Sequence, residues 1–120
     1  MMDDFILVVD DNDGVRHLLK EVLTQEGFKV RAACNGDEAL QIVHQSPPLL
    51  IILDLKMPGT NGCEVLKRLK AMSSNIPVIM ITAYTQQKEM EEALDDGLLK
   101  YFLHKPFELS RLREMLQIVR

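Results

Sequence analysis

Two hydrophobic periodicities alternate along this chain, and their alternation limits the folds that it can adopt more than any other feature. Five short apolar runs of strand length occupy residues 5–9, 28–32, 49–53, 77–82 and 101–103. Between these runs, and after the last, apolar residues recur at the spacing of an amphipathic helix, in segments 15–23, 39–43, 65–69, 86–96 and 109–119. Strands that alternate strictly with helices predict a parallel sheet with helices on both faces.

Punctuating residues support these boundaries. Gly27 stands where the C-terminal cap of the first helix is expected, and Pro47 and Pro48 close the second helix. Residues 58–62 contain two glycines and a proline and are predicted to form a loop. Because crossovers between parallel strands are right-handed, few topologies remain. We expect an α/β, flavodoxin-like (βα)5 fold with the strand order 2-1-3-4-5.

Length and composition exclude several classes of protein. A chain of 120 residues suits one domain, and we expect a single domain over residues 1–120. The net charge of −4 argues against direct nucleic-acid binding. The apolar runs are too short to cross a membrane, and residues 1–4 do not resemble a signal peptide, so a cytoplasmic location is expected. The two cysteines, Cys34 and Cys63, have no metal-like or redox-like spacing and are expected to be reduced thiols without a role.

Polar residues end or follow four of the five predicted strands. Asp10 and Asp11 follow the first strand, Asp54 the third, Thr82 ends the fourth, and Lys105 comes soon after the fifth. The carboxyl ends of parallel strands point to the same edge of a sheet, which is where ligands bind in open α/β folds. We therefore expect three carboxylates, one hydroxyl and one ammonium group to converge there.

This combination of groups suits a metal-assisted phosphoryl transfer. Three crowded carboxylates repel one another, and a hard divalent cation such as Mg²⁺ (or Mn²⁺) is the usual compensation. A carboxylate can act as the nucleophile that forms an aspartyl phosphate. A cation and a lysine can stabilise the charge on the transferred group. Asp10 and Asp11 have a simpler alternative role as acids that open a helix.

Four motifs resemble those of response regulator receiver domains. They are VVDD at residues 8–11, DLKMPG at 54–59, IMITA at 79–83 and KPF at 105–107. Each is weak alone, but all four occur in order at predicted strand ends, and the resemblance spans essentially the whole chain. It implies that Asp54 is the phosphoacceptor and that Asp10 and Asp11 bind Mg²⁺ together with Asp54 and the backbone carbonyl of Lys56. The side chains of Lys56 and Tyr84 would flank the phosphoryl group and tune its lifetime.

The resemblance also implies a set of switch residues. Lys105 would contact the phosphoryl group, and the hydroxyl of Thr82 would move toward it. Phe102, three residues before the lysine, would be the aromatic residue that turns inward. The chain carries one residue more than expected between Gly97 and Lys105, which leaves Tyr101 as the alternative switch aromatic.

The implied function is a phosphorylation switch rather than an enzyme acting on an external metabolite. The donor would be a sensor histidine kinase or a histidine phosphotransfer protein. The surface of segments 86–96, 101–103 and 109–119 would change on phosphorylation and could form a homodimer. The output would be either that of a stand-alone phosphorelay protein or that of a receiver within a longer regulator.

Two other functions fit part of the pattern. A Mg²⁺-dependent phosphatase with an aspartyl-phosphate intermediate would carry a second acid two residues after Asp54, where this chain has Lys56. A degenerate receiver could act only as a dimerisation module, but the complete set of acids, with Thr82 and Lys105, argues against that.

Overall fold

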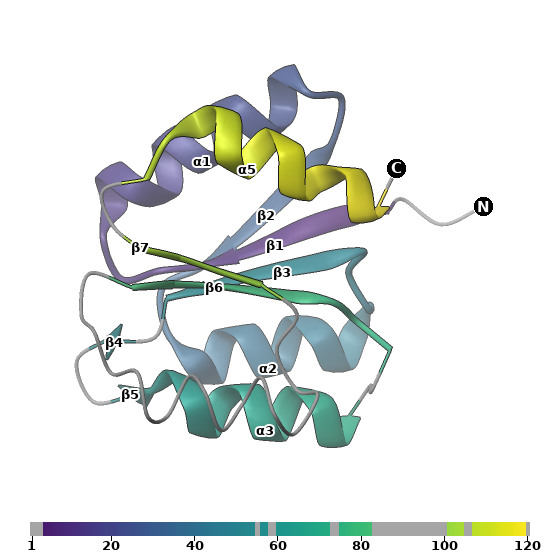
Figure 1. Cartoon of the computed structure of the whole chain (residues 1–120). Coiled ribbons are helices and arrows are strands. Elements are labelled where there is room, and N and C mark those ends of the chain that lie inside the picture. The colour runs from purple at the N-terminus through teal and green to yellow at the C-terminus, as the bar shows by residue number, and fades with distance from the viewer. Residues whose placement is uncertain are drawn as a thin grey trace.

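The computed structural model describes residues 4–54, 56–57, 60–72, 75–82, 101–104 and 107–119 (Figure 1). For Lys56, Thr82, Tyr101 and Phe102, among others, it describes the backbone alone. In chain order the elements are β1 (Phe5–Val9), α1 (Asp13–Gln25), β2 (Lys29–Ala33), α2 (Gly36–Gln45), β3 (Leu50–Asp54), β4 (Lys56–Met57), β5 (Thr60–Asn61), α3 (Gly62–Met72), β6 (Val78–Thr82), β7 (Tyr101–His104), α5 (Leu109–Met115) and the 3-10 helix η1 (Leu116–Val119).

The main sheet has five strands in the order β2-β1-β3-β6-β7, and every neighbouring pair is parallel. The fourth and fifth predicted strands are β6 and β7, so the predicted fold and strand order are confirmed. In register, Val9 of β1 lies beside Leu53 of β3, and Asp54 lies beside Ile81 of β6. The residues that follow β1 and β3 therefore meet at one edge of the sheet.

Helices cover both faces of the sheet, as the alternating pattern predicts. Figure 1 shows α1 and α5 on one face and α2 and α3 on the other. In β1, Phe5, Leu7 and Val9 pack on the α2 and α3 side, whereas Ile6 and Val8 pack on the α1 and α5 side. All five residues of β1 are buried, which explains why this strand is apolar without alternation.

The second strand begins one residue later than predicted because Phe28 belongs to the end of α1. Gly27 has a φ of 95°, its N–H donates to the carbonyl of Thr24, and the N–H of Phe28 donates to the carbonyl of Leu23. These two bonds form a Schellman motif, which ends a helix with a left-handed residue that is usually glycine. The predicted role of Gly27 is thus confirmed, and β2 starts at Lys29.

One further described segment departs from a simple alternation of strands and helices. Within the segment predicted to be a loop, residues 58–62, Thr60 and Asn61 form β5, and Gly62 begins α3. The strand β5 pairs with β4 in a short antiparallel ladder, Lys56 with Asn61 and Met57 with Thr60. The predicted helix at 86–96 lies outside the described residues. Among the helices that the structure describes, none combines the length and apolar character needed to cross a bilayer.

Candidate functional site

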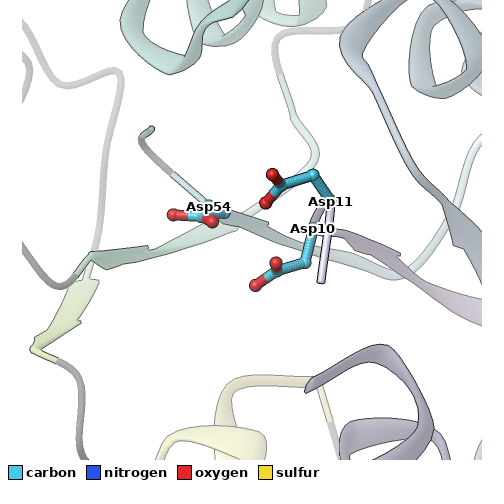
Figure 2. Close-up of side chains that lie close together, drawn as sticks. All are labelled: Asp10, Asp11 and Asp54. Atoms are coloured by element: carbon cyan, nitrogen blue, oxygen red, sulfur yellow. The ribbon is translucent and has the colours of Figure 1, made fainter. Parts of the chain in front are cut away.

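Three carboxylates lie together at the carboxyl edge of the sheet (Figure 2). Asp10 follows β1, Asp11 comes next, and Asp54 is the last residue of β3. One oxygen from each of the three lies within 4.8 Å of the other two. Asp10 is 2% exposed and Asp54 5% exposed, whereas Asp11 is open to solvent. The three acids therefore converge in the structure, as predicted.

The turn between β1 and α1 is held by hydrogen bonds from both sides. The N–H of Asp10 donates to the carbonyl of Ala33 in β2 at 3.2 Å, and the N–H of Asn12 donates to Oδ1 of Asp10 at 2.9 Å. The side chain of Asn12 in turn accepts the N–H of Val15 at 3.0 Å and caps α1. Since α1 begins at Asp13, Asp10 and Asp11 precede the helix and do not open it.

Arg16, on the first turns of α1, also bonds to this turn. Its Nη1 donates to the backbone carbonyl of Asp10 at 2.6 Å, and its other terminal nitrogen contacts the carboxylate of Asp13. Neither Arg16 nor Asn12 was predicted from the sequence to belong to the site. A signal for Asn12 was present, because asparagine before a helical apolar stripe is typical of an N-cap. The hydrogen bond from the side chain of Arg16 to the backbone carbonyl of Asp10 has no comparable signal in the sequence.

The chemistry of the three donors fits a hard divalent cation. Every donor is a carboxylate oxygen, which suits Mg²⁺ or Mn²⁺, whereas structural Zn²⁺ sites usually draw on cysteine and histidine. Within the described part of the chain, this is the one group of three or more acidic, histidine or cysteine side chains arranged to hold a metal ion. The cluster also concentrates negative charge at an edge where Asp10 and Asp54 are shielded from water.

The backbone brings Thr82 to the same edge. Thr82 is the last residue of β6 and lies in register with His104, the last residue of β7. It follows Ile81, which lies beside Asp54. The side chain of Thr82 and the whole of Lys105 lie outside the described residues, so their predicted roles toward a phosphoryl group stay predictions.

The remaining predicted site residues are described in part or not at all. Lys56 lies in β4, two residues beyond Asp54, with its backbone described. In β7 the backbone of Phe102 lies beside Met80 and that of Tyr101 beside Ile79, so the two candidates for the switch aromatic are consecutive ladder positions. The choice between them rests on side chains outside the described set. Tyr84 also lies outside the described residues.

Cys34 lies at the same edge, one residue beyond β2. Its Sγ donates to Oε2 of Glu38 at 2.9 Å, and this hydrogen bond, with burial and the charge of Glu38, raises the pKa of the thiol. The positive charge of Arg16 acts in the opposite direction. A thiol with a raised pKa is a weak nucleophile, because the thiolate is the reactive form.

Comparison with known proteins gives a consistent result. The family model of the response regulator receiver domain matches residues 6–117. The chain is 44% identical over 114 residues to sporulation initiation phosphotransferase F of Bacillus subtilis (strain 168), a match that covers 95% of this chain and 91% of that protein.

Solved structures agree with this match. The chemotaxis protein CheY4 of Vibrio cholerae has a TM-score of 0.88 at 30% identity, with 99% of this chain and 100% of that chain covered. The response regulator TrrA of Thermotoga maritima, in complex with Mg²⁺-BeF, has a TM-score of 0.85 at 33% identity, with 98% and 99% covered.

Proposed function

This chain belongs to the response regulator receiver family, and we propose that it is a phosphorylation switch that accepts a phosphoryl group on Asp54. The observation that carries the proposal is the cluster of three carboxylates at the carboxyl edge of the sheet. Asp54 ends a strand whose other residues are apolar and buried. A buried carboxylate costs stability unless it is compensated, so its presence at this position needs a reason.

Asp54 is the best placed of the three acids to act as the nucleophile. It ends β3, the middle strand of the sheet, and is 5% exposed, whereas Asp11 is open to solvent. In the transfer, an oxygen of Asp54 attacks phosphorus and a new P–O bond forms. The bond from phosphorus to the donor atom breaks, and the electron pair leaves with the donor, which is an imidazole nitrogen of a phosphohistidine.

A cation is needed because a phosphoryl group brings more negative charge to an acidic site. Mg²⁺ held by Asp10, Asp11 and Asp54, with the backbone carbonyl of Lys56, would supply the positive charge that offsets the equatorial phosphoryl oxygens. The structure of the response regulator TrrA in complex with Mg²⁺-BeF supports this choice of cation. Mn²⁺ has the same preference for oxygen ligands.

The chain's own residues would convert the new charge into a change of surface. The hydroxyl of Thr82 and the ammonium of Lys105 would bind phosphoryl oxygens, since added phosphate oxygens are strong acceptors. The change would pass to β7 through Phe102 and reach the neighbouring α5. The partner is a sensor histidine kinase or a histidine phosphotransfer protein, and the similarity to sporulation initiation phosphotransferase F supports a place in a phosphorelay.

The direct test is the intact mass of the protein after incubation with acetyl phosphate and Mg²⁺. We expect a gain of one phosphoryl group that disappears when EDTA replaces Mg²⁺ and in the variant Asp54→Asn. The matched control is Asp37→Asn, which removes an exposed acid of α2 outside the cluster and should leave the gain intact. A gain that survives Asp54→Asn, or that does not require the cation, would contradict the assignment.

A further inference from the structure

Arg16 binds the peptide that joins two of the three acids. Its Nη1 donates to the backbone carbonyl of Asp10 at 2.6 Å, and its other terminal nitrogen contacts the carboxylate of Asp13. The side chain of Arg16 is only 20% exposed. We propose that Arg16 is a positioning residue for the cation site: it fixes the turn that aims Asp10 and Asp11 at Asp54.

The geometry of the peptide bond explains why one hydrogen bond can orient two side chains. The carbonyl of Asp10 lies in the rigid plane that links Asp10 to Asp11. Holding this carbonyl therefore fixes ψ of Asp10 and φ of Asp11, the two torsions that direct their side chains relative to each other. The N–H of Asp10 is tied to Ala33, and the N–H of Asn12 is tied to Oδ1 of Asp10. Arg16 completes this set by holding the peptide between them.

Arginine suits this task better than lysine. Its guanidinium is planar, always charged and has several donors in a fixed arrangement, so it can bond a carbonyl and a carboxylate at once. The carboxylate of Asp13 is 92% exposed, and an exposed ion pair contributes little stability by itself. Its contribution here is to hold the guanidinium in the orientation that reaches the carbonyl of Asp10.

The charge of Arg16 and its hydrogen bond have opposite effects on cation affinity. A positive charge near the acids repels a cation, so removal of the charge alone would tighten Mg²⁺ binding. Loss of the hydrogen bond would let the peptide rotate and would spread the carboxylates, which weakens binding. A weaker affinity in a variant without Arg16 can therefore come only from lost positioning, because the electrostatic effect has the other sign.

Calorimetric titration of the full chain with MgCl₂ alone tests this role. The positioning role rests on the proposed function for the identity of the ion. The titration itself needs no phosphoryl transfer. We expect Arg16→Ala to raise the Kd for Mg²⁺ about tenfold, the lower end of the effect of removing outer partners of metal ligands. Arg16→Lys, which keeps one donor for the carbonyl of Asp10 but not the two-pronged geometry, should give a Kd between those of Arg16→Ala and the wild type. Arg68→Ala, which breaks an ion pair with Glu64 on α3, should leave the Kd unchanged.

Hydrogen exchange in the metal-free protein gives a second readout that is independent of any ion. The N–H of Asn12 should exchange about tenfold faster in Arg16→Ala, because its acceptor on Asp10 moves. The N–H of Glu38, bonded to Oδ1 of Asn35 at the start of α2, is the matched control and should not change. Arg16→Lys keeps the test valid if the alanine variant unfolds.

The outcomes separate the two proposals. Unchanged or tighter Mg²⁺ binding in both Arg16 variants, with normal exchange at Asn12, would overturn the positioning role whatever Asp54 does. Failure of the wild type to gain a phosphoryl group would reject the proposed function. In that case, weaker Mg²⁺ binding and faster exchange at Asn12 in the Arg16 variants would still support the positioning role.

Discussion

Asp54→Asn should stabilise the metal-free protein, because three carboxylates are held against their mutual repulsion. For charges 4.8 Å apart, the upper limit of the separations in the cluster, Coulomb's law gives about 3.5 kcal/mol per pair at an effective dielectric constant of about 20 and about 0.9 kcal/mol in bulk water. The buried pair of Asp10 and Asp54 lies nearer the first limit, and pairs with the exposed Asp11 lie nearer the second. The variant removes two of the three repulsions.

The increase in the free energy of unfolding is smaller than the sum of the two repulsion energies that the variant removes. Asp54 has other interactions in the folded protein, and asparagine keeps one carbonyl acceptor but loses the charge-assisted part of them. We expect a net increase of about 1–3 kcal/mol in the free energy of unfolding, most of it from the buried pair. For a chain of this length, each kcal/mol raises the melting temperature by about 4 °C.

Thermal unfolding followed by circular dichroism, in EDTA at low ionic strength, measures this difference. Saturating Mg²⁺ should reduce or reverse it, because a cation that binds the folded state stabilises the wild type more than a variant lacking one ligand. Asp37→Asn is the control, and it should cost up to about 0.5 kcal/mol, since it removes an acid from the first turn of α2. If Asp54→Asn melted at or below the wild-type temperature in EDTA, the acids would not be in repulsive contact.

Three further outcomes follow from local structure. Asn12→Ala should lower the free energy of unfolding by about 1 kcal/mol in urea denaturation, because the cap of α1 is lost, whereas serine at this position should restore most of the loss. Ile52→Ala, at a side chain that is 1% exposed, should cost about 2–5 kcal/mol in the same assay. Leu18→Ala, at a side chain that is 45% exposed, should stay within about 0.5 kcal/mol, and equal costs would contradict the packing described. Glu38→Gln should lower the pKa of Cys34 and so increase the thiolate fraction at a given pH. Peptide mapping should then find faster alkylation of Cys34 by iodoacetamide. An unchanged rate would be evidence against the hydrogen bond from Cys34 to Glu38.

The strands could be predicted because most of them have no competing interpretation. A run such as residues 50–53, buried on both faces, is too short for a helix and too apolar for a loop. The boundaries were predicted less closely, since they depend on backbone hydrogen bonds and not on composition. Phe28 has the apolar side chain of a strand residue, but its N–H closes the end of α1. The short ladder of β4 and β5 carries no periodic signal in two-residue strands.

The acids of the site could be predicted from the position of each strand end, whereas the residues that orient them could not. Asp10 and Asp54 follow residues that lie side by side in the sheet, so their proximity is a consequence of topology. The bond from Arg16 to the carbonyl of Asp10 depends on how α1 leaves the strand. Sequence spacing alone would pair Arg16 with Asp13, one turn earlier on the helix, and would not reach the backbone.

The same acids also help to define the register of the sheet. A strand that is buried on one face fixes its register by alternation, because a slip of one residue exposes its apolar side. The strands β1 and β3 are buried on both faces, so a slip of either would exchange one apolar residue for another at small cost. Asp10 and Asp54 disfavour such a change of register. A shift of either strand into the sheet would place a carboxylate between the apolar layers and away from its hydrogen-bond partners. The charges that the proposed chemistry requires at the edge of the sheet therefore also disfavour the alternative pairings that would misplace them.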